Sequence, residues 1–154
     1  MVSTRCGFNN APGSPGSDLL VSYGPTLLVD IGFDLNFKPE VPGLVPVAGI
    51  RSVQALVDTG ATESCIDGLL AAQLGLPIVD RRPISGVHGA HAVSIHLAQV
   101  VVPSLDNCKI YGAFAAVDLA SGGQIHRALI GRTFLRNFTM VYEGRTGTVT
   151  ISSD

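Results

Sequence analysis

The sequence has few cysteines, few charged residues and no long apolar run. Its three cysteines, Cys6, Cys65 and Cys108, are odd in number and lack CxxC spacing, which argues against both a disulfide framework and a zinc ribbon. Such cysteine usage fits a reducing compartment. A net charge of −2 gives no basic footprint for nucleic acid. No apolar run approaches the ~20 residues that a membrane-spanning helix needs.

The sequence does contain enough apolar residues for one folded domain. Its 154 residues are 46% hydrophobic, and the N-terminus lacks the basic-then-apolar pattern of a secretory signal. We therefore expect a soluble, cytoplasmic domain. Residues 1–25 are rich in Gly, Pro, Ser and Asn, a composition that buries too little apolar surface to offset the entropy of ordering. They predict a flexible tail, followed by a folded domain over residues 26–154.

The most informative segment is residues 55–67, ALVDTGATESCID, in which an apolar strand runs directly into Asp58. Burying an unpaired carboxylate costs several kcal/mol, so an aspartate at the end of a buried strand suggests that the protein uses it. Gly60 allows a tight turn that leaves the carboxylate reachable from outside. Alone, an Asp-Thr-Gly tripeptide is also compatible with a plain surface turn.

A second segment, residues 128–135 (ALIGRTFL), again runs apolar residues into a glycine and continues as a short helical pattern. In this order and spacing, the two segments resemble the retropepsin-like aspartic proteases, and the resemblance covers about residues 26–151. It implies a mostly-β, closed acid-protease-like barrel with one or two short helices. The C-terminal hairpin pattern, residues 139–151, is closer to cellular and bacterial members than to short retroviral enzymes.

The resemblance assigns supporting roles to Ile130, Gly131 and Arg132, which would pack behind the Asp-Thr-Gly loop. The usual aspartate partner of this arginine is replaced by Thr62 here. Glu63 is the candidate substitute, and a solvated surface arginine is the alternative.

A glycine-bracketed tip lies between two strand patterns at residues 84–93. Gly86 and Gly89 flank Val87 and His88, which predicts a mobile hairpin tip. The family places its flap, the hairpin that covers the substrate, in this interval. Residues 38–46, with three prolines, predict a loop in place of the tight turn of short retroviral enzymes. Further patterns predict strand segments at 26–36, 47–50, 53–57, 93–103 and 110–119, a helix at 66–74, and a loop at 120–127.

Aspartic proteolysis needs two close carboxylates that share one proton and activate one water. The sequence supplies one, so catalysis demands a homodimer with Asp58 from each copy at a two-fold axis. By resemblance, Thr59 would hydrogen-bond across that axis and Gly60 would present backbone to a peptide or protein substrate. Ala61 lacks the hydroxyl donor that pepsin-like enzymes place there, which favours activity at mildly acidic pH. The alternative is a catalytically inactive, protease-like dimeric module that binds peptides.

Other chemistries are less well supported by the sequence. The spacing of His88, His91 and His96 fits no standard zinc ligand set, and we expect neither metal nor cofactor. Cys65 with a histidine would be a nucleophile pair, but its segment has the pattern of a packed one. The remaining aspartates considered occupy helix-cap or loop contexts, where we expect them to be solvated: Asp67, Asp80, Asp106 and Asp118.

Overall fold

The computed structural model describes residues 1–86 and 89–153. The strands are β1 (Val2–Arg5), β2 (Thr26–Gly32), β3 (Ile50–Val57), β4 (Cys65–Asp67), β5 (Ile78–Gly86), β6 (Gly89–Val102), β7 (Cys108–Val117), β8 (Ala128–Ile130), β9 (Thr139–Glu143) and β10 (Thr148–Ser153). The α-helices are α1 (Gly16–Tyr23), α2 (Gly68–Gln73) and α3 (Arg132–Leu135), and a 3₁₀ turn spans Pro103–Leu105. None of these helices has the length and hydropathy that crossing a bilayer would require.

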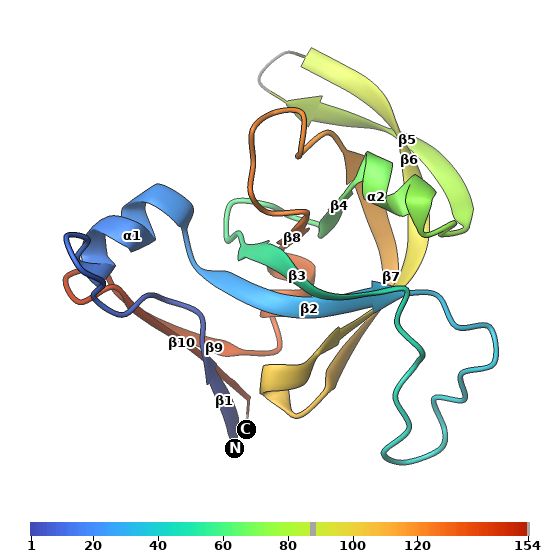
Figure 1. The fold of residues 1–154 in the computed structure, drawn as a ribbon. Coiled ribbons are helices and arrows are strands. Elements are labelled where there is room, and N and C mark those ends of the chain that lie inside the picture. The colour runs from blue at the N-terminus through green and yellow to red at the C-terminus, as the bar shows by residue number, and fades with distance from the viewer. Residues whose placement is uncertain (87–88, 154) are drawn as a thin grey trace.

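Six strands close into a barrel. They pair in the order β2-β3-β8-β4-β7-β6, and β6 also pairs with β2. The strand β5 lies outside the barrel and forms the first strand of a long hairpin with β6 (Figure 1). The alternating residues Leu27, Val29 and Ile31 of β2 point into the core, as their common parity predicts. The expected mostly-β, closed acid-protease-like fold with short helices is confirmed.

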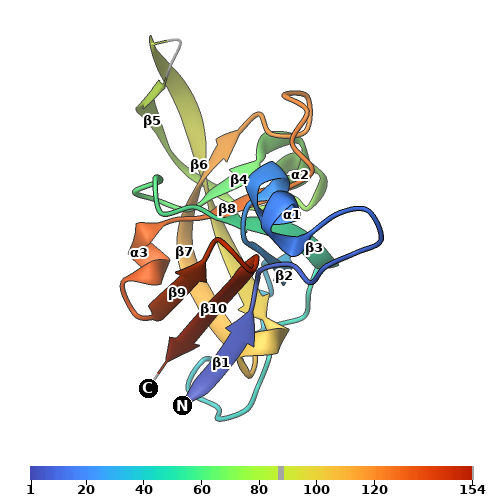
Figure 2. The same ribbon diagram turned by 90° about the vertical axis from the view of Figure 1, so that its left-hand side faces the viewer.

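The predicted flexible tail is instead folded. In the structure β1 pairs antiparallel with β10, and the two strands run side by side in Figure 2. Cys6 and Leu20 are each only 2% exposed and join the same core as the barrel strands. The composition was misleading because β10 offers a free edge for backbone hydrogen bonds, which a polar, glycine-rich segment can satisfy as well as any other.

Two element predictions differ from the structure in detail. The helix expected at 66–74 is shorter, because Cys65–Asp67 first form β4, which pairs in parallel with β7. The two strand segments expected at residues 47–50 and 53–57 are one strand, β3, which begins only at Ile50. The proline-rich segment before it is a loop, as predicted, and the Asp34 carboxylate accepts backbone N–H groups from Asn36 (2.9 Å) and Val47 (3.0 Å) at its two ends.

Candidate active site

Asp58 lies immediately after β3, at the start of a surface loop that we call the DTG loop (residues 58–64). Its backbone N–H donates to the carbonyl oxygen of Ile130 at 2.9 Å, which fixes the loop to the end of β8. Its Oδ1 accepts the backbone N–H of Gly60 at 2.9 Å. The side chain is half-buried, whereas Thr59 and Gly60 are exposed. The carboxylate is therefore held by the loop and remains accessible from outside.

The turn from β8 into α3 lies directly behind the DTG loop. A Cβ atom on Gly131 would sit 2.6 Å from the carbonyl oxygen of Glu63 and 3.0 Å from that of Ala61, so only glycine fits. The Gly131 N–H donates to the buried Ser64 hydroxyl at 3.1 Å, and the Arg132 N–H donates to Ala61 O at 2.9 Å. The two segments singled out in the sequence thus form one hydrogen-bonded unit.

The Arg132 side chain also binds the DTG loop, but through neutral groups. Its Nη1 donates to the carbonyl oxygen of Thr59 at 2.7 Å, and its Nη2 donates to the Thr62 hydroxyl at 2.9 Å. Glu63 instead contacts Arg82 of β5 at 3.4 Å. The expected substitution of Glu63 as the partner of Arg132 is therefore wrong. The threonine hydroxyl at the position of the missing carboxylate takes that role.

A cleft of about 520 Å³ opens between the DTG loop and the β5–β6 hairpin. Small and medium side chains form most of its lining, and Glu63 and Arg82 supply its charged groups. Its lining residues are Gly60, Ala61, Thr62, Glu63, Cys65, Arg82, Pro83, Ile95 and Ala115. Such a cleft has room for the side chains of an extended peptide beside the Asp58 loop.

The hairpin that borders the cleft is the one expected to carry the flap. Gly86 at the end of β5 pairs with Gly89 at the start of β6, and the hairpin extends well beyond the barrel in both views (Figures 1 and 2). Val87 and His88, the other two predicted flap residues, lie outside the described residues. Gly89 has a φ of 98°, a conformation that favours glycine.

A family model described as gag-polyprotein putative aspartyl protease matches residues 45–137, which include the whole DTG loop and Gly131. The chain belongs to this aspartyl protease family. No curated protein matches the chain at a significant level. The match begins within the loop before β3 and ends just after α3, so it covers the two segments that build the site.

The structure also bears on the rival chemistries. Burial raises the pKa of the Cys65 thiol to about 11, and the negative charges of Glu63 and Asp58 contribute to the rise. A thiol in that state is a poor nucleophile at neutral pH. His96 is buried and donates from Nδ1 to the carbonyl oxygen of Leu76 at 2.9 Å. Among the described residues, no cluster of potential metal ligands is present.

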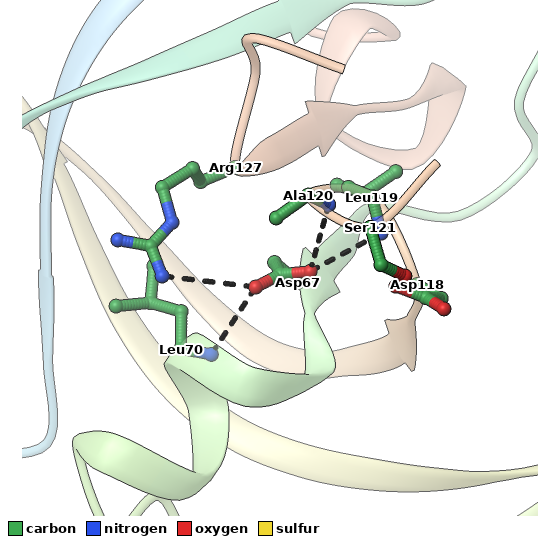
Figure 3. Close-up of polar contacts among 7 residues, drawn as sticks. All are labelled: Asp67, Leu70, Asp118, Leu119, Ala120, Ser121 and Arg127. Atoms are coloured by element: carbon green, nitrogen blue, oxygen red, sulfur yellow. Dashed lines mark hydrogen bonds and ion pairs between the residues drawn. The ribbon is translucent and has the colours of Figure 1, made fainter. Parts of the chain in front are cut away.

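Asp67 was expected to be solvated, and this prediction is wrong: its exposure is 1%. Figure 3 shows its carboxylate between α2 and the loop after β7. Oδ2 accepts the Leu70 N–H at 3.3 Å, which caps α2, and Oδ1 accepts the N–H groups of Leu119 (3.1 Å) and Ala120 (3.2 Å). The guanidinium of Arg127 lies 3.7 Å away. The place of Asp67 at the N-terminus of a helix could be predicted from the sequence, whereas its contacts with residues 119–127 could not.

Burial by itself raises the pKa of Asp67, but the hydrogen bonds from Ala120, Leu119 and Leu70 and the charge of Arg127 lower it, and the net shift is downward. Arg127 adds a main-chain connection, because its N–H donates to Gln54 O and its carbonyl accepts the Asp67 N–H, both at 2.9 Å. Asp67 therefore fixes the loop that leads into β8, the strand on which the backbone of Asp58 is held.

His126 is a second buried polar residue that the sequence analysis missed, since an isolated histidine in a polar loop gives no signal. It is 1% exposed, with Nε2 2.8 Å from the Thr26 hydroxyl and Nδ1 3.3 Å from Oε1 of Gln124. Burial lowers the pKa of His126. The residue joins the loop before β8 to the start of β2.

Proposed function

We propose that the protein is an aspartic endopeptidase that hydrolyses extended polypeptides as a homodimer, with one Asp58 carboxylate from each copy. The observation that carries this proposal is the DTG loop itself. It presents an accessible carboxylate next to a cleft and is held from behind by Gly131 and Arg132. Partial burial of a carboxylate costs free energy, so an aspartate held in this way is expected where the carboxylate takes part in a reaction.

The chemistry follows from two carboxylates that share one proton around a water molecule. The ionised carboxylate takes a proton from the water, which attacks the carbonyl carbon of the scissile peptide, while the other carboxylate donates its proton to the carbonyl oxygen. The tetrahedral intermediate then collapses and its C–N bond breaks. The carboxyl group that took a proton from the water gives it to the leaving nitrogen, and the other carboxylate regains a proton from a hydroxyl of the intermediate as the new carboxylic acid forms. The Gly60 N–H, which already binds Oδ1 of Asp58, would hold each carboxylate in place during these steps.

The surrounding residues have roles that follow from their positions. Arg132 would keep the carbonyl of Thr59 and the hydroxyl of Thr62 in place, so that the loop does not shift when two copies meet. The β5–β6 hairpin would close over the substrate as a flap, with Gly86 and Gly89 beside its tip. Because Ala61 offers no hydroxyl to the carboxylate, we expect a bell-shaped activity profile centred at mildly acidic pH.

The decisive experiment compares wild type with Asp58→Asn on a diverse peptide pool between pH 4 and 7. The variant is nearly isosteric, so it should fold normally and lose cleavage entirely. A mimic with a hydroxyl in place of the attacked carbonyl should bind wild type much more tightly than the variant. Retained cleavage, or equal binding of the mimic, would refute the dyad. Peptide binding without cleavage by wild type would identify an inactive peptide-binding module.

A further inference from the structure

The strand β7 has a free edge over most of its length. Residues 108–115 pair with β6 on one side, whereas on the other side β4 pairs only with residues 115–117. Within the part of the chain that the structure describes, no strand therefore borders the second edge of residues 108–114. A free strand edge presents a row of backbone donors and acceptors and can pair with any extended segment that reaches it.

The DTG loop leaves this edge uncovered because its own backbone bonds to α3 instead. The carbonyl oxygen of Thr62 accepts the N–H of Thr133 at 3.0 Å. The chain reaches β7 only at the next residue but one, where the Ser64 carbonyl accepts the N–H of Ala115 at 3.3 Å. The position beside β7 that β4 occupies farther along the sheet is therefore vacant next to residues 108–114.

A groove of about 290 Å³ fills this position. One wall is the free edge itself, residues 108–114, and the other includes Phe134 and Phe138, from α3 and the turn that follows it. Figure 2 shows α3 beside β7. A Cβ atom on Gly112, in the middle of the first wall, would meet nothing within 4 Å. We call this space the β7 groove; it leaves room for a backbone to approach the strand closely.

The pairing of β7 with β6 shows which backbone groups point into the groove. In antiparallel strands, opposed residues alternate between pairs that exchange hydrogen bonds and pairs that do not. Leu97 of β6 is opposite Ala113, but its N–H donates to the carbonyl of Pro77 at 2.9 Å, away from β7. Ala113 and Tyr111 therefore direct their N–H and C=O groups away from β6. Both residues are exposed, and these groups have no hydrogen-bond partner among the described residues.

We propose that the β7 groove binds an extended segment of the polypeptide substrate, which pairs with β7 as an added strand. The inference rests on the proposed function, because the substrate supplies the extended chain. The groove adjoins the cleft beside the DTG loop, since Ala113 lines the groove and Ala115 of the same strand lines the cleft. Lys109 is the one charged residue among the described residues that line the groove, so a segment with acidic residues should bind best.

The first test uses a peptide probe with blocked ends, made of about eight alternating valine and glutamate residues, and the full chain. At saturating probe, hydrogen exchange of the Tyr111 and Ala113 amides, measured by NMR, should slow by roughly tenfold or more. The amides of Ile110 and Gly112, which face β6, should change little and serve as internal controls.

Two modified probes test the backbone pairing itself. One carries N-methyl groups on its valines and the other on its glutamates, so that they differ only in which alternate N–H groups are blocked. Alternate N–H groups of an added strand face β7, and the side-chain pattern determines which ones. One version should therefore bind roughly tenfold more weakly than the other.

The charge preference is tested with Lys109→Glu, which should raise the Kd of the unmodified probe by roughly threefold to tenfold. The matched control is Lys38→Glu, which alters the only other lysine of the sequence, an exposed residue on the loop between β2 and β3 that does not line the groove. It should leave the Kd unchanged. Thermal melts of both variants check that the fold is intact.

Unchanged exchange at Tyr111 and Ala113, equal binding of the two methylated probes, or equal effects of the two lysine variants would overturn the inference. A probe that dissociates a dimer of the wild type would overturn it too, because a second copy would then occupy this edge. Asp58→Asn separates the two proposals and should still bind the probe. If it loses cleavage and neither protein binds the probe, the protease proposal stands and the β7 groove fails. If it binds the probe and retains cleavage, the dyad fails and the groove stands as a peptide-binding site.

Discussion

Replacing Asp67 by Asn tests whether the buried carboxylate holds the loop behind the active site. The substitution keeps the shape of the side chain, but it removes the charge and turns one acceptor oxygen into a donor. The N–H groups of Leu70, Leu119 and Ala120 then compete for one oxygen, and Arg127 loses its partner. Their unmet hydrogen bonds remain at a site that is 1% exposed in the native protein.

The magnitude follows from those contacts. A hydrogen bond to a charged group contributes about 1.5–3 kcal/mol, and breaking a buried ion pair costs about 3–5 kcal/mol. Arg127 is one-third exposed and 3.7 Å away, so water screens much of its share. We therefore expect Asp67→Asn to lower the free energy of unfolding by about 2–4 kcal/mol. For a chain of this size the corresponding fall in Tm is roughly 4–16 °C.

The pH dependence gives the sharper criterion. Because the pKa of Asp67 is lowered in the folded state, its contribution is fully present above the unfolded pKa, near 3.9, and is lost as pH falls through the folded value. Urea unfolding should show a constant gap between wild type and Asp67→Asn from pH 7 to about pH 5, and a shrinking gap below about pH 4. The carboxylate thus remains ionised at the mildly acidic pH proposed for catalysis.

The matched control is Asp106→Asn. Asp106 is an exposed aspartate with a φ of 52°, a conformation that asparagine also adopts readily, so its free energy of unfolding should change by less than about 0.5 kcal/mol. If Asp67→Asn is no less stable than this control at pH 7, the three backbone hydrogen bonds are not stabilising and the reasoning is refuted.

Two further substitutions test the supports of the site. Gly131→Ala places a Cβ 2.6 Å from the Glu63 carbonyl oxygen, so we expect the free energy of unfolding to fall by about 1–3 kcal/mol. Specific activity should fall by more than the fraction of folded protein does. A Tm and an activity equal to those of wild type would show that the loop accommodates the extra methyl group. His126→Gln removes a histidine whose folded pKa is lowered by burial. The unfolded chain therefore takes up a proton at this histidine near pH 6.5, before the folded chain does. As pH falls below about 6.5, the free energy of unfolding of wild type should decrease, and that of the variant should decrease less. Equal pH dependence of the two proteins in urea unfolding would contradict this.

Much of the site could be predicted from the sequence because its determinants are local. An apolar strand ending at Asp58 with Gly60 two residues later specifies a turn that exposes a carboxylate, whatever surrounds it. The alternation of Leu27, Val29 and Ile31 likewise determines which face of β2 is buried. Gly131 was recognised by the apolar residues before it, and the structure supplies the reason, which is the lack of space for a Cβ beside Glu63.

What only the tertiary structure decided is which distant groups meet. Nothing near Asp67 indicates that the N–H groups of residues 119 and 120 will approach its carboxylate, because that meeting depends on the parallel pairing of β4 with β7. Glu63 and Arg132 are close in space, yet closure of the barrel brings Arg82 to the glutamate and leaves Arg132 with a hydroxyl and a carbonyl. The N-terminal residues became ordered for the same reason. The topology of the whole chain determines which donor meets which acceptor, whereas the composition gives only the numbers of donors and acceptors.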